Sequence, residues 1–154
     1  IIRGLVGSEM CIRDRISDPG NLGTIIRLCD WFGLSELFCS YDTVDCYNPK
    51  VIQASMGSIA RVRCHYIDNL GDYLKSLKKP IFGASLNGKS IYEHKLVKEA
   101  TYIFGSESHG ISKDILKNLN CELTIPHFRT DKSKPDSLNV ANSVGIFLSE
   151  LSKK

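Results

Sequence analysis

The sequence predicts an α/β fold, in which a parallel sheet carries helices on both faces. Short apolar runs bounded by glycine, proline or asparagine alternate along the chain with amphipathic segments of about ten residues. This alternation is typical of strand–helix–strand units, whose crossover connections produce parallel strands. With 154 residues, 42% of them hydrophobic, the chain is long enough for one domain with its own core.

The first regular elements follow a turn cluster at residues 18–21. Residues 22–32 are predicted to form a helix, because the apolar side chains at 22, 25, 26, 29 and 32 share one face and Gly33 follows them. Residues 37–41 (LFCSY) have the short apolar pattern of a buried strand. Asn48 and Pro49 are suited to begin a helix, which we expect to end near residue 57.

The middle of the chain continues the alternation. Residues 61–67 alternate in polarity and predict a strand, and residues 70–78 predict a short helix rich in leucine and lysine. Two further apolar runs, residues 80–84 and residues 100–104 (ATYIF), predict strands, the second of which ends at Gly105.

The last part of the chain predicts two helices around one strand. Ser112 is expected to cap a helix over residues 113–119, and residues 121–125 (CELTI) return as a strand. The final helix is expected to begin near Ser137 and to run to the C-terminus, because apolar residues recur there in one stripe at helical spacing.

Residues 1–15 do not resemble the rest and are left out of the fold prediction. They show neither helical nor strand periodicity, nor the apolar segment and small-residue cleavage site of a secretory signal. The segment is similar to translated adapter sequence, so residues 16–154 are treated as the domain. We expect the N-terminal part of a first strand to be missing and residues 1–15 to occupy its place.

Composition excludes some classes of protein and leaves others open. No apolar run approaches the roughly 20 residues that a membrane-spanning helix needs, so we expect no membrane partner. A net charge of +3 gives no strong basic field, so any nucleic-acid binding would rest on local groups such as Arg27, Arg61 and Arg63. Six dispersed cysteines without a C-x-x-C pair indicate reduced thiols and a cytoplasmic location. Cys64 and His65 are adjacent and would pair poorly as zinc ligands, so we expect no metal site.

Residues 83–90 (GASLNGKS) match the phosphate-binding P-loop pattern letter for letter, after a predicted strand. A P-loop must be followed by a helix whose N-terminus faces the phosphates. Residues 91–94 lead instead into a weakly patterned stretch, and no later strand ends in an aspartate that could organise Mg²⁺. We therefore interpret the segment as a glycine-containing loop and keep a P-loop nucleotide triphosphatase as an alternative.

Three other stretches place glycine or small polar residues beside the carboxyl ends of predicted strands, where α/β sheets bind ligands. They are residues 21–27 (NLGTIIR), residues 105–110 (GSESHG), and Ile125-Pro126 followed by residues 137–142 (SLNVAN). A role in the core explains their apolar residues but leaves Arg27, Glu107 and Asn139 unexplained.

Together these stretches resemble the three ordered motifs of the SpoU (TrmH-type) RNA 2′-O-ribose methyltransferases, namely N-x-G-x-x-x-R, G-x-E-x-x-G, and I-P followed by S-L-N-V. Residues 48–51 (NPKV) and 54–58 (ASMGS) are also typical of that family. The resemblance covers the chain from about Ile16 to its end.

The resemblance implies a SPOUT fold whose C-terminal part forms a trefoil knot, which periodicity does not predict. It implies S-adenosyl-L-methionine as the cofactor, bound largely through backbone groups at Leu86, Gly105, Ile125 and Leu138. The loop at residues 83–90 would then border this cofactor. Family members are homodimers that build each active site from both subunits.

The resemblance also assigns catalytic positions to Arg27, Asn21, Glu107 and Asn139, and substrate binding to Arg27 and Ser137. Methyl transfer to a ribose hydroxyl needs no metal, but the hydroxyl must lose its proton. Because a guanidinium stays protonated, we expect Arg27 to bind phosphate or ribose and to favour the developing alkoxide. Asn21, Glu107 and Asn139 would hold Arg27, the partner subunit or the nucleotide. Capping or loop hydrogen bonding is the alternative for Asn21 and Glu107, and Ser137 would contact substrate, cap the last helix, or both.

Residues 127–136 form a longer loop than is usual in the family and lack the glycine often found there. Arg129, Lys132 and Lys134 either extend an RNA-facing surface or form a solvated charged loop. The sequence thus predicts an S-adenosylmethionine-dependent 2′-O-methyltransferase of structured rRNA or tRNA. The alternative from another class is a catalytically silent RNA-binding or ribosome-assembly protein of the same fold.

Overall fold

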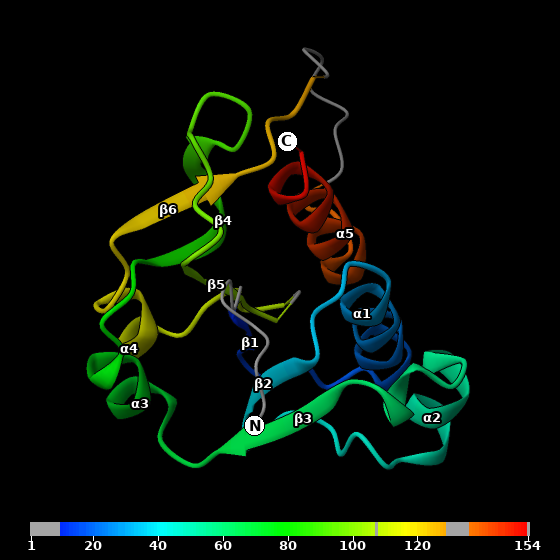
Figure 1. Cartoon of the computed structure of the whole chain (residues 1–154). Helices are drawn as coiled ribbons and strands as arrows, with labels where there is room; N and C mark the ends of the chain where they lie inside the picture. The colour runs from blue at the N-terminus through cyan, green and yellow to red at the C-terminus, as the bar shows by residue number, and fades with distance from the viewer. Residues whose placement is uncertain (1–9, 107, 129–135, 154) are drawn as a thin grey trace, which may run out of the picture.

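A computed structural model describes residues 10–106, 108–128 and 136–153. Its centre is a six-stranded sheet with the strand order β3-β2-β1-β5-β4-β6 (Figure 1), in which every pairing is parallel. The strands are Met10–Arg13 (β1), Glu36–Ser40 (β2), Arg63–Ile67 (β3), Ile81–Ser90 (β4), Thr101–Phe104 (β5) and Cys121–Thr124 (β6). The predicted parallel α/β sheet is confirmed.

Helices cover both faces of the sheet, as predicted. Figure 1 shows α1 (Pro19–Trp31), α2 (Pro49–Ser55) and α5 (Val140–Leu151) on one side, and α3 (Leu70–Ser76) and α4 (Lys113–Leu116) on the other. A short 3₁₀ helix, η1 (Ser58–Ala60), follows α2. The expected helices over 70–78 and 113–119 are therefore present but shorter.

The sheet separates two apolar clusters, and β5 contributes to both. Tyr102 and Phe104 belong to the larger cluster, with α1 and α5, while Ile103 between them belongs to the smaller one, with α3 and α4. All three are buried, because both faces of a central parallel strand are covered. The ring of Phe104 meets that of Phe147 edge-on, with centroids 5.1 Å apart, so α5 packs over the end of β5.

Strand β1 lies within residues 1–15, which were expected to occupy the place of a first strand although no strand bounds were predicted there. Met10–Arg13 pairs with β2 on one side and β5 on the other, in the middle of the sheet, and Ile12 is fully buried. Four residues are too few to show a period, and they lie in the segment that was left out of the prediction. The domain boundary near residue 16 stays a prediction.

Two helices begin elsewhere than predicted. Helix α1 begins at Pro19, because the Oδ1 of Asp18 accepts the Asn21 N–H at 2.7 Å and so caps the helix. Helix α5 begins at Val140 instead of near Ser137, because Asn139 is its cap. The interpretation of Ser137 as the helix cap is therefore wrong.

Candidate functional site

Three of the four expected cofactor residues lie close together in the sheet: Gly105 and Ile125 directly follow their strands, and Leu86 lies within β4. Strand β4 pairs with β5 and β6, and Ala84 is level with both Phe104 and Leu123. Gly105 directly follows Phe104, Leu86 lies two residues after Ala84, and Ile125 lies two residues after Leu123. The fold therefore brings Leu86, Gly105 and Ile125 to the same edge of the sheet, where parallel α/β sheets bind ligands.

Residues 85–88 leave the strand pairing and then return to it. Both Ala84 and Lys89 are level with Leu123, so the four residues between them bulge out of the sheet. The bulge lies against β6: Thr124 Oγ1 donates to the carbonyl oxygen of Leu86 at 3.3 Å. A Cβ on Gly88 would come within 2.5 Å of the Glu122 carbonyl group, so this close approach requires glycine. The Leu86 side chain, 69% exposed, points away from the core.

This geometry argues against the P-loop alternative. Lys89 lies in β4, level with Leu123, instead of in a loop around a phosphate. Residues 91–94 form a turn where a P-loop would open a helix. The glycines of the match serve close packing as well: a Cβ on Gly83 would lie 2.5 Å from the side chain of Leu119.

Ser106 and Gly110 are paired with each other directly after β5. Ser106 and Gly110 form two backbone hydrogen bonds with each other, of 3.1 and 2.8 Å, and Gly110 has a φ of +65°. A Cβ on Gly105 would lie 2.0 Å from the Gly110 carbonyl carbon, so only glycine fits there. Glu107 lies outside the described residues, and its catalytic role stays a prediction.

The first and third motifs are joined by a side-chain hydrogen bond. Asn139 Nδ2 donates to Asn21 Oδ1 at 2.9 Å, between residues 118 positions apart. The Oδ1 of Asn139 accepts the backbone N–H groups of Ala141 (2.9 Å) and Asn142 (3.3 Å), so this residue also caps α5. Capping thus falls to Asp18 and Asn139, which the sequence analysis did not identify as caps, although aspartate and asparagine before a helix are the usual signal.

Arg27 lies on the exposed surface of α1. It forms no ion pair with any residue in the described part of the chain. Gly23, four residues earlier and so on the same side of the helix, lies against α2: a Cβ there would be 2.5 Å from Ala54 Cβ. Within the N-x-G-x-x-x-R motif, Gly23 therefore packs two helices together while Arg27 presents its guanidinium outside.

Ser137 and Leu138 lie just before the cap of α5, and both are exposed. Leu138 keeps 47% of its surface exposed, which leaves an apolar side chain beside Asn139. Their contacts with substrate and cofactor stay predictions. Arg129, Lys132 and Lys134 lie outside the described residues.

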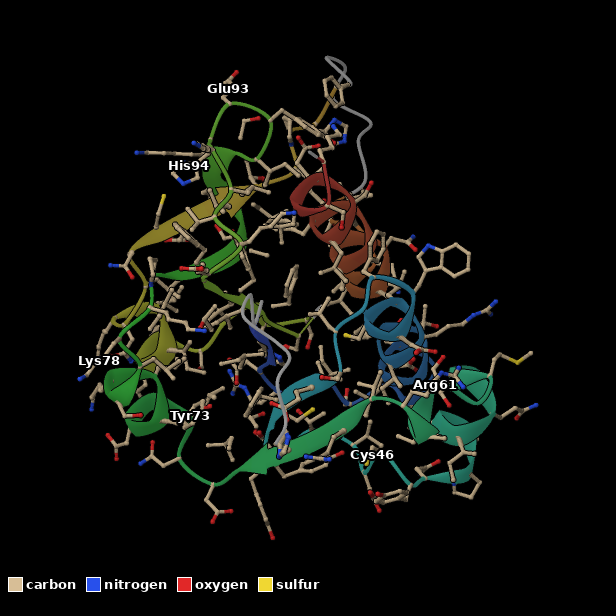
Figure 2. The ribbon with its side chains drawn as sticks, in the orientation of Figure 1. Cys46, Arg61, Tyr73, Lys78, Glu93 and His94 are labelled. Atoms are coloured by element: carbon tan, nitrogen blue, oxygen red, sulfur yellow. The ribbon has the colours of Figure 1, made fainter. Side chains whose placement is uncertain are left out.

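Arg61 binds an acidic side chain, which the sequence analysis did not foresee. Its Nη2 and Nε contact Asp30 at 2.6 and 3.0 Å, and Ser58 Oγ donates to the same carboxylate at 2.7 Å. These hydrogen bonds, that of Arg61 foremost, hold the pKa of Asp30 below its ordinary value. Arg61 (Figure 2) thus ties η1 to α1 and is less available to RNA than Arg27.

The described residues hold no group of three histidine, cysteine or acidic side chains that could bind a metal ion. Cys46, Cys64 and Cys121 carry free thiols. Burial raises the pKa of the Cys64 thiol, so this cysteine stays protonated. In the part of the chain that the structure covers, no helix combines the length and apolar character needed to span a bilayer.

Comparison with known proteins gives one family. Residues 10–149 match the SpoU rRNA Methylase family. The chain is 32% identical over 150 residues to the 23S rRNA (guanosine(2553)-2′-O)-methyltransferase RlmP of Bacillus subtilis, covering 93% of this chain and 57% of that one. It is 35% identical over 145 residues to the 23S rRNA (guanosine-2′-O-)-methyltransferase RlmB of Blochmanniella floridana, covering 92% and 56%.

Solved structures that resemble this chain include RNA methyltransferases as well. A Porphyromonas gingivalis protein assigned to the TrmH family of RNA methyltransferases superposes with a TM-score of 0.87 at 37% identity, covering 96% of this chain and 60% of that one. An AdoMet-bound rRNA methyltransferase from Sinorhizobium meliloti gives a TM-score of 0.82 at 28% identity, covering 94% and 55%. The chain spans less than two thirds of the length of each of these relatives.

Proposed function

The chain belongs to the SpoU rRNA methylase family, and on this premise we propose that it methylates the 2′-hydroxyl of a ribose in structured rRNA or tRNA. The observation that carries the proposal is the assembly of the motifs. The Asn21–Asn139 hydrogen bond joins the first to the third, and paired strands bring Gly105 level with the Leu86 bulge. The relatives named for 2′-O-methylation of 23S rRNA support the reaction and the substrate class.

The cofactor of this proposal is S-adenosylmethionine, which supplies an electrophilic methyl group when bound. The residues present fit it: Leu86 and Leu138 leave apolar side chains exposed, and the bulge and the Ser106–Gly110 pair present backbone groups at the same sheet edge. Leu86, Gly105, Ile125 and Leu138 would hold it. The AdoMet bound to the Sinorhizobium meliloti relative supports this assignment.

Arg27 would bind the ribose or its phosphate. A guanidinium can form two parallel hydrogen bonds to phosphate oxygens and brings a positive charge to them. A fixed positive charge next to the 2′-oxygen stabilises the alkoxide that develops as the proton leaves. Asn21 and Asn139 would position α1 and α5 around the nucleotide through their hydrogen bond. Glu107 and Ser137 would complete the site.

Dimerisation and the knot are further parts of the proposal. Trp31 is 84% exposed on α1, four residues after Arg27, and a homodimer would cover this apolar surface next to the site. A C-terminal trefoil knot, which the resemblance to the family implies, completes the proposed fold. The free cysteine thiols support a cytoplasmic location.

Analytical sedimentation of the wild-type chain and of Trp31→Glu tests the homodimer. The wild-type chain should sediment as a dimer and the variant as a monomer.

Methyl transfer from radiolabelled S-adenosylmethionine to total RNA tests the function. We expect label in RNA with the wild-type chain and at least about 100-fold less with Arg27→Ala, the effect of removing one charge-stabilising donor. Affinity for S-adenosylmethionine should not change, and Lys75→Ala, which removes an exposed lysine paired with Asp72 on α3, should transfer normally. Tight cofactor binding without any transfer would favour the silent RNA-binding alternative.

A further inference from the structure

Two exposed aromatic rings meet beside the expected cofactor residues. Tyr92 follows β4 and Phe128 follows β6, and their ring centroids are 6.3 Å apart with an interplanar angle of 38°. Tyr92 is 47% exposed and Phe128 is 81% exposed. Large apolar rings that gather on a surface mark places where another molecule binds.

The pairing of β4 with β6 holds Tyr92 close to the site. Ile91, which is buried, donates its backbone N–H to the Thr124 carbonyl at 3.0 Å, and the Tyr92 N–H donates to Ser90 Oγ at 3.2 Å. Thr124 also donates its hydroxyl to the carbonyl of Leu86. The aromatic pair is therefore connected, through one threonine, to the bulge expected to bind the cofactor.

A polar hollow of about 380 Å³ lies next to Tyr92. It is lined by the segment from Ile91 to Leu96, by Lys98, and by Glu150, Leu151 and Lys153 at the end of α5. None of the expected cofactor residues lines it.

Three lysines (Lys95, Lys98 and Lys153) and two glutamates (Glu93 and Glu150) line the hollow, so their formal charges sum to +1. Lys153 is paired with Glu150, whereas Lys95 and Lys98 form no ion pair with the described residues. Figure 2 shows the acidic side chain of Glu93 at the outer tip of the segment, directed away from the ribbon. Two unpaired lysines beside exposed aromatic rings are the combination that binds single-stranded nucleic acid: bases stack on the rings and phosphates meet the cations.

We propose that Tyr92 and Phe128 form a stacking surface for an unpaired base next to the methylated nucleotide, with Lys95 and Lys98 binding the adjacent phosphates. The inference rests on the proposed function, because it assumes an RNA substrate. Structured rRNA and tRNA expose unpaired bases in loops, where each base offers a flat face to an aromatic ring. Stacking of a neighbouring base would hold the target ribose near the cofactor edge of the sheet.

Binding of a fluorescein-labelled ten-nucleotide oligoadenylate, followed by anisotropy with the full chain, tests the stacking surface. We expect Tyr92→Ala and Phe128→Ala each to weaken binding by about 5- to 150-fold, the range measured for one base stacked on one ring. The same oligomer with abasic central positions should bind these variants and the wild-type chain within about twofold, because it offers no base to stack. Tyr92→Phe keeps the ring and should bind oligoadenylate normally.

Two controls separate stacking from other effects. Tyr47→Ala removes another exposed tyrosine (71% exposed), whose neighbour Cys46 lies at the opposite end of the molecule from Glu93 in Figure 2. This variant should bind both oligomers as the wild-type chain does. Lys95→Ala should weaken both oligomers and lower the slope of log affinity against log salt by about one. Calorimetric affinity for S-adenosylmethionine should be the same in all variants.

Several outcomes overturn the stacking surface. Equal loss of binding to the intact and abasic oligomers would show that the rings do not stack on bases. A shift of Phe128→Ala from dimer to monomer in sedimentation, with oligoadenylate binding unchanged, would show that a second copy of the chain covers the rings. If the wild-type chain methylates RNA while both alanine variants bind oligoadenylate normally, the stacking surface alone fails. If the wild-type chain binds neither S-adenosylmethionine nor RNA, the proposed function fails with it.

Discussion

Asn139 donates a hydrogen bond from Nδ2 to the Oδ1 of Asn21 at 2.9 Å, while its own Oδ1 accepts two backbone N–H groups of α5. One amide therefore starts α5 and ties it to the first turn of α1. The two functions use different atoms of the same side chain. A substitution can remove one and keep the other, so structural and catalytic contributions are separable.

Asn139→Ala removes the cap and the link to Asn21 together. We expect it to lower the free energy of unfolding by about 1–2 kcal/mol, as loss of a helix cap does. Asn139→Asp keeps an oxygen for the cap but has no donor for Asn21. In urea denaturation, Asn139→Asp should be more stable than Asn139→Ala. Both variants should transfer methyl groups more slowly than the wild-type chain, and at similar rates, because both lack the link to Asn21. Asn142→Ala, on the same helix turn, is the control and should transfer methyl groups normally. Normal transfer by Asn139→Asp would contradict a catalytic role for the Asn21–Asn139 hydrogen bond.

Gly23 is expected to tolerate no side chain. A Cβ would lie 2.5 Å from Ala54 Cβ and 2.7 Å from the Val51 carbonyl oxygen, so α1 and α2 would have to separate. Gly23→Ala should lower the free energy of unfolding by about 1–3 kcal/mol, as overpacking of a close interface does. Gly145→Ala is the matched control, since the nearest atom would be a Leu28 methyl at 3.5 Å. It should stabilise the chain by about 0.5–1 kcal/mol, because alanine favours helix over glycine. Equal denaturation midpoints for the two variants would contradict the packing role of Gly23.

Local signals in the sequence predicted most elements but not where some of them begin. Ser137 and Asn139 are both good caps, and nothing nearby in the sequence decides between them. The structure selects Asn139, which also contacts Asn21 at the other end of the chain. Likewise the prediction ended a strand at residue 84, whereas β4 resumes at Lys89 because Gly88 lets it approach β6. Both errors come from contacts between distant segments, which local periodicity does not record.

The motifs predict the expected cofactor residues as a set, and the strand pairing brings three of them, Leu86, Gly105 and Ile125, to one edge of the sheet, as a parallel sheet requires. Their binding of the cofactor stays a prediction. The motifs alone do not predict which of their residues serve packing and which are left to bind ligands. Gly23 and Gly105 are needed for close packing, and Asn139 is needed for a helix start, while Arg27 has no structural partner among the described residues.

The Asp30–Arg61 ion pair is expected to make stability depend on pH in the acid range. The pKa of Asp30 is lower in the folded chain than its ordinary value of 3.8, so the folded state favours the charged carboxylate. The stabilisation is then complete above about pH 5 and is lost as the pH falls through the folded pKa. Arg61→Ala should unfold at lower urea concentration than the wild-type chain at pH 7. The difference between the two midpoints should shrink as the pH falls below 3.8 and through the folded pKa. A difference that stays constant over the whole acid range would mean that Arg61 stabilises the chain by packing instead.

Substitution of Gly105 by alanine should weaken cofactor binding by more than the accompanying loss of folding stability explains. A Cβ there would lie 2.0 Å from the Gly110 carbonyl carbon, so Gly105→Ala must open the Ser106–Gly110 pairing at the expected cofactor edge. We expect calorimetric affinity for S-adenosylmethionine to fall by at least about tenfold, the effect of losing about 1.4 kcal/mol of binding energy. Gly33→Ala is the control for strain alone: Gly33 has a φ of +80° and open space around its Cβ, so the variant should cost about 1–2 kcal/mol of stability. Gly33 lies after α1, and its variant should bind S-adenosylmethionine normally. If Gly105→Ala also binds normally while its thermal midpoint falls, the Ser106–Gly110 pairing is structural and the cofactor lies elsewhere along this edge.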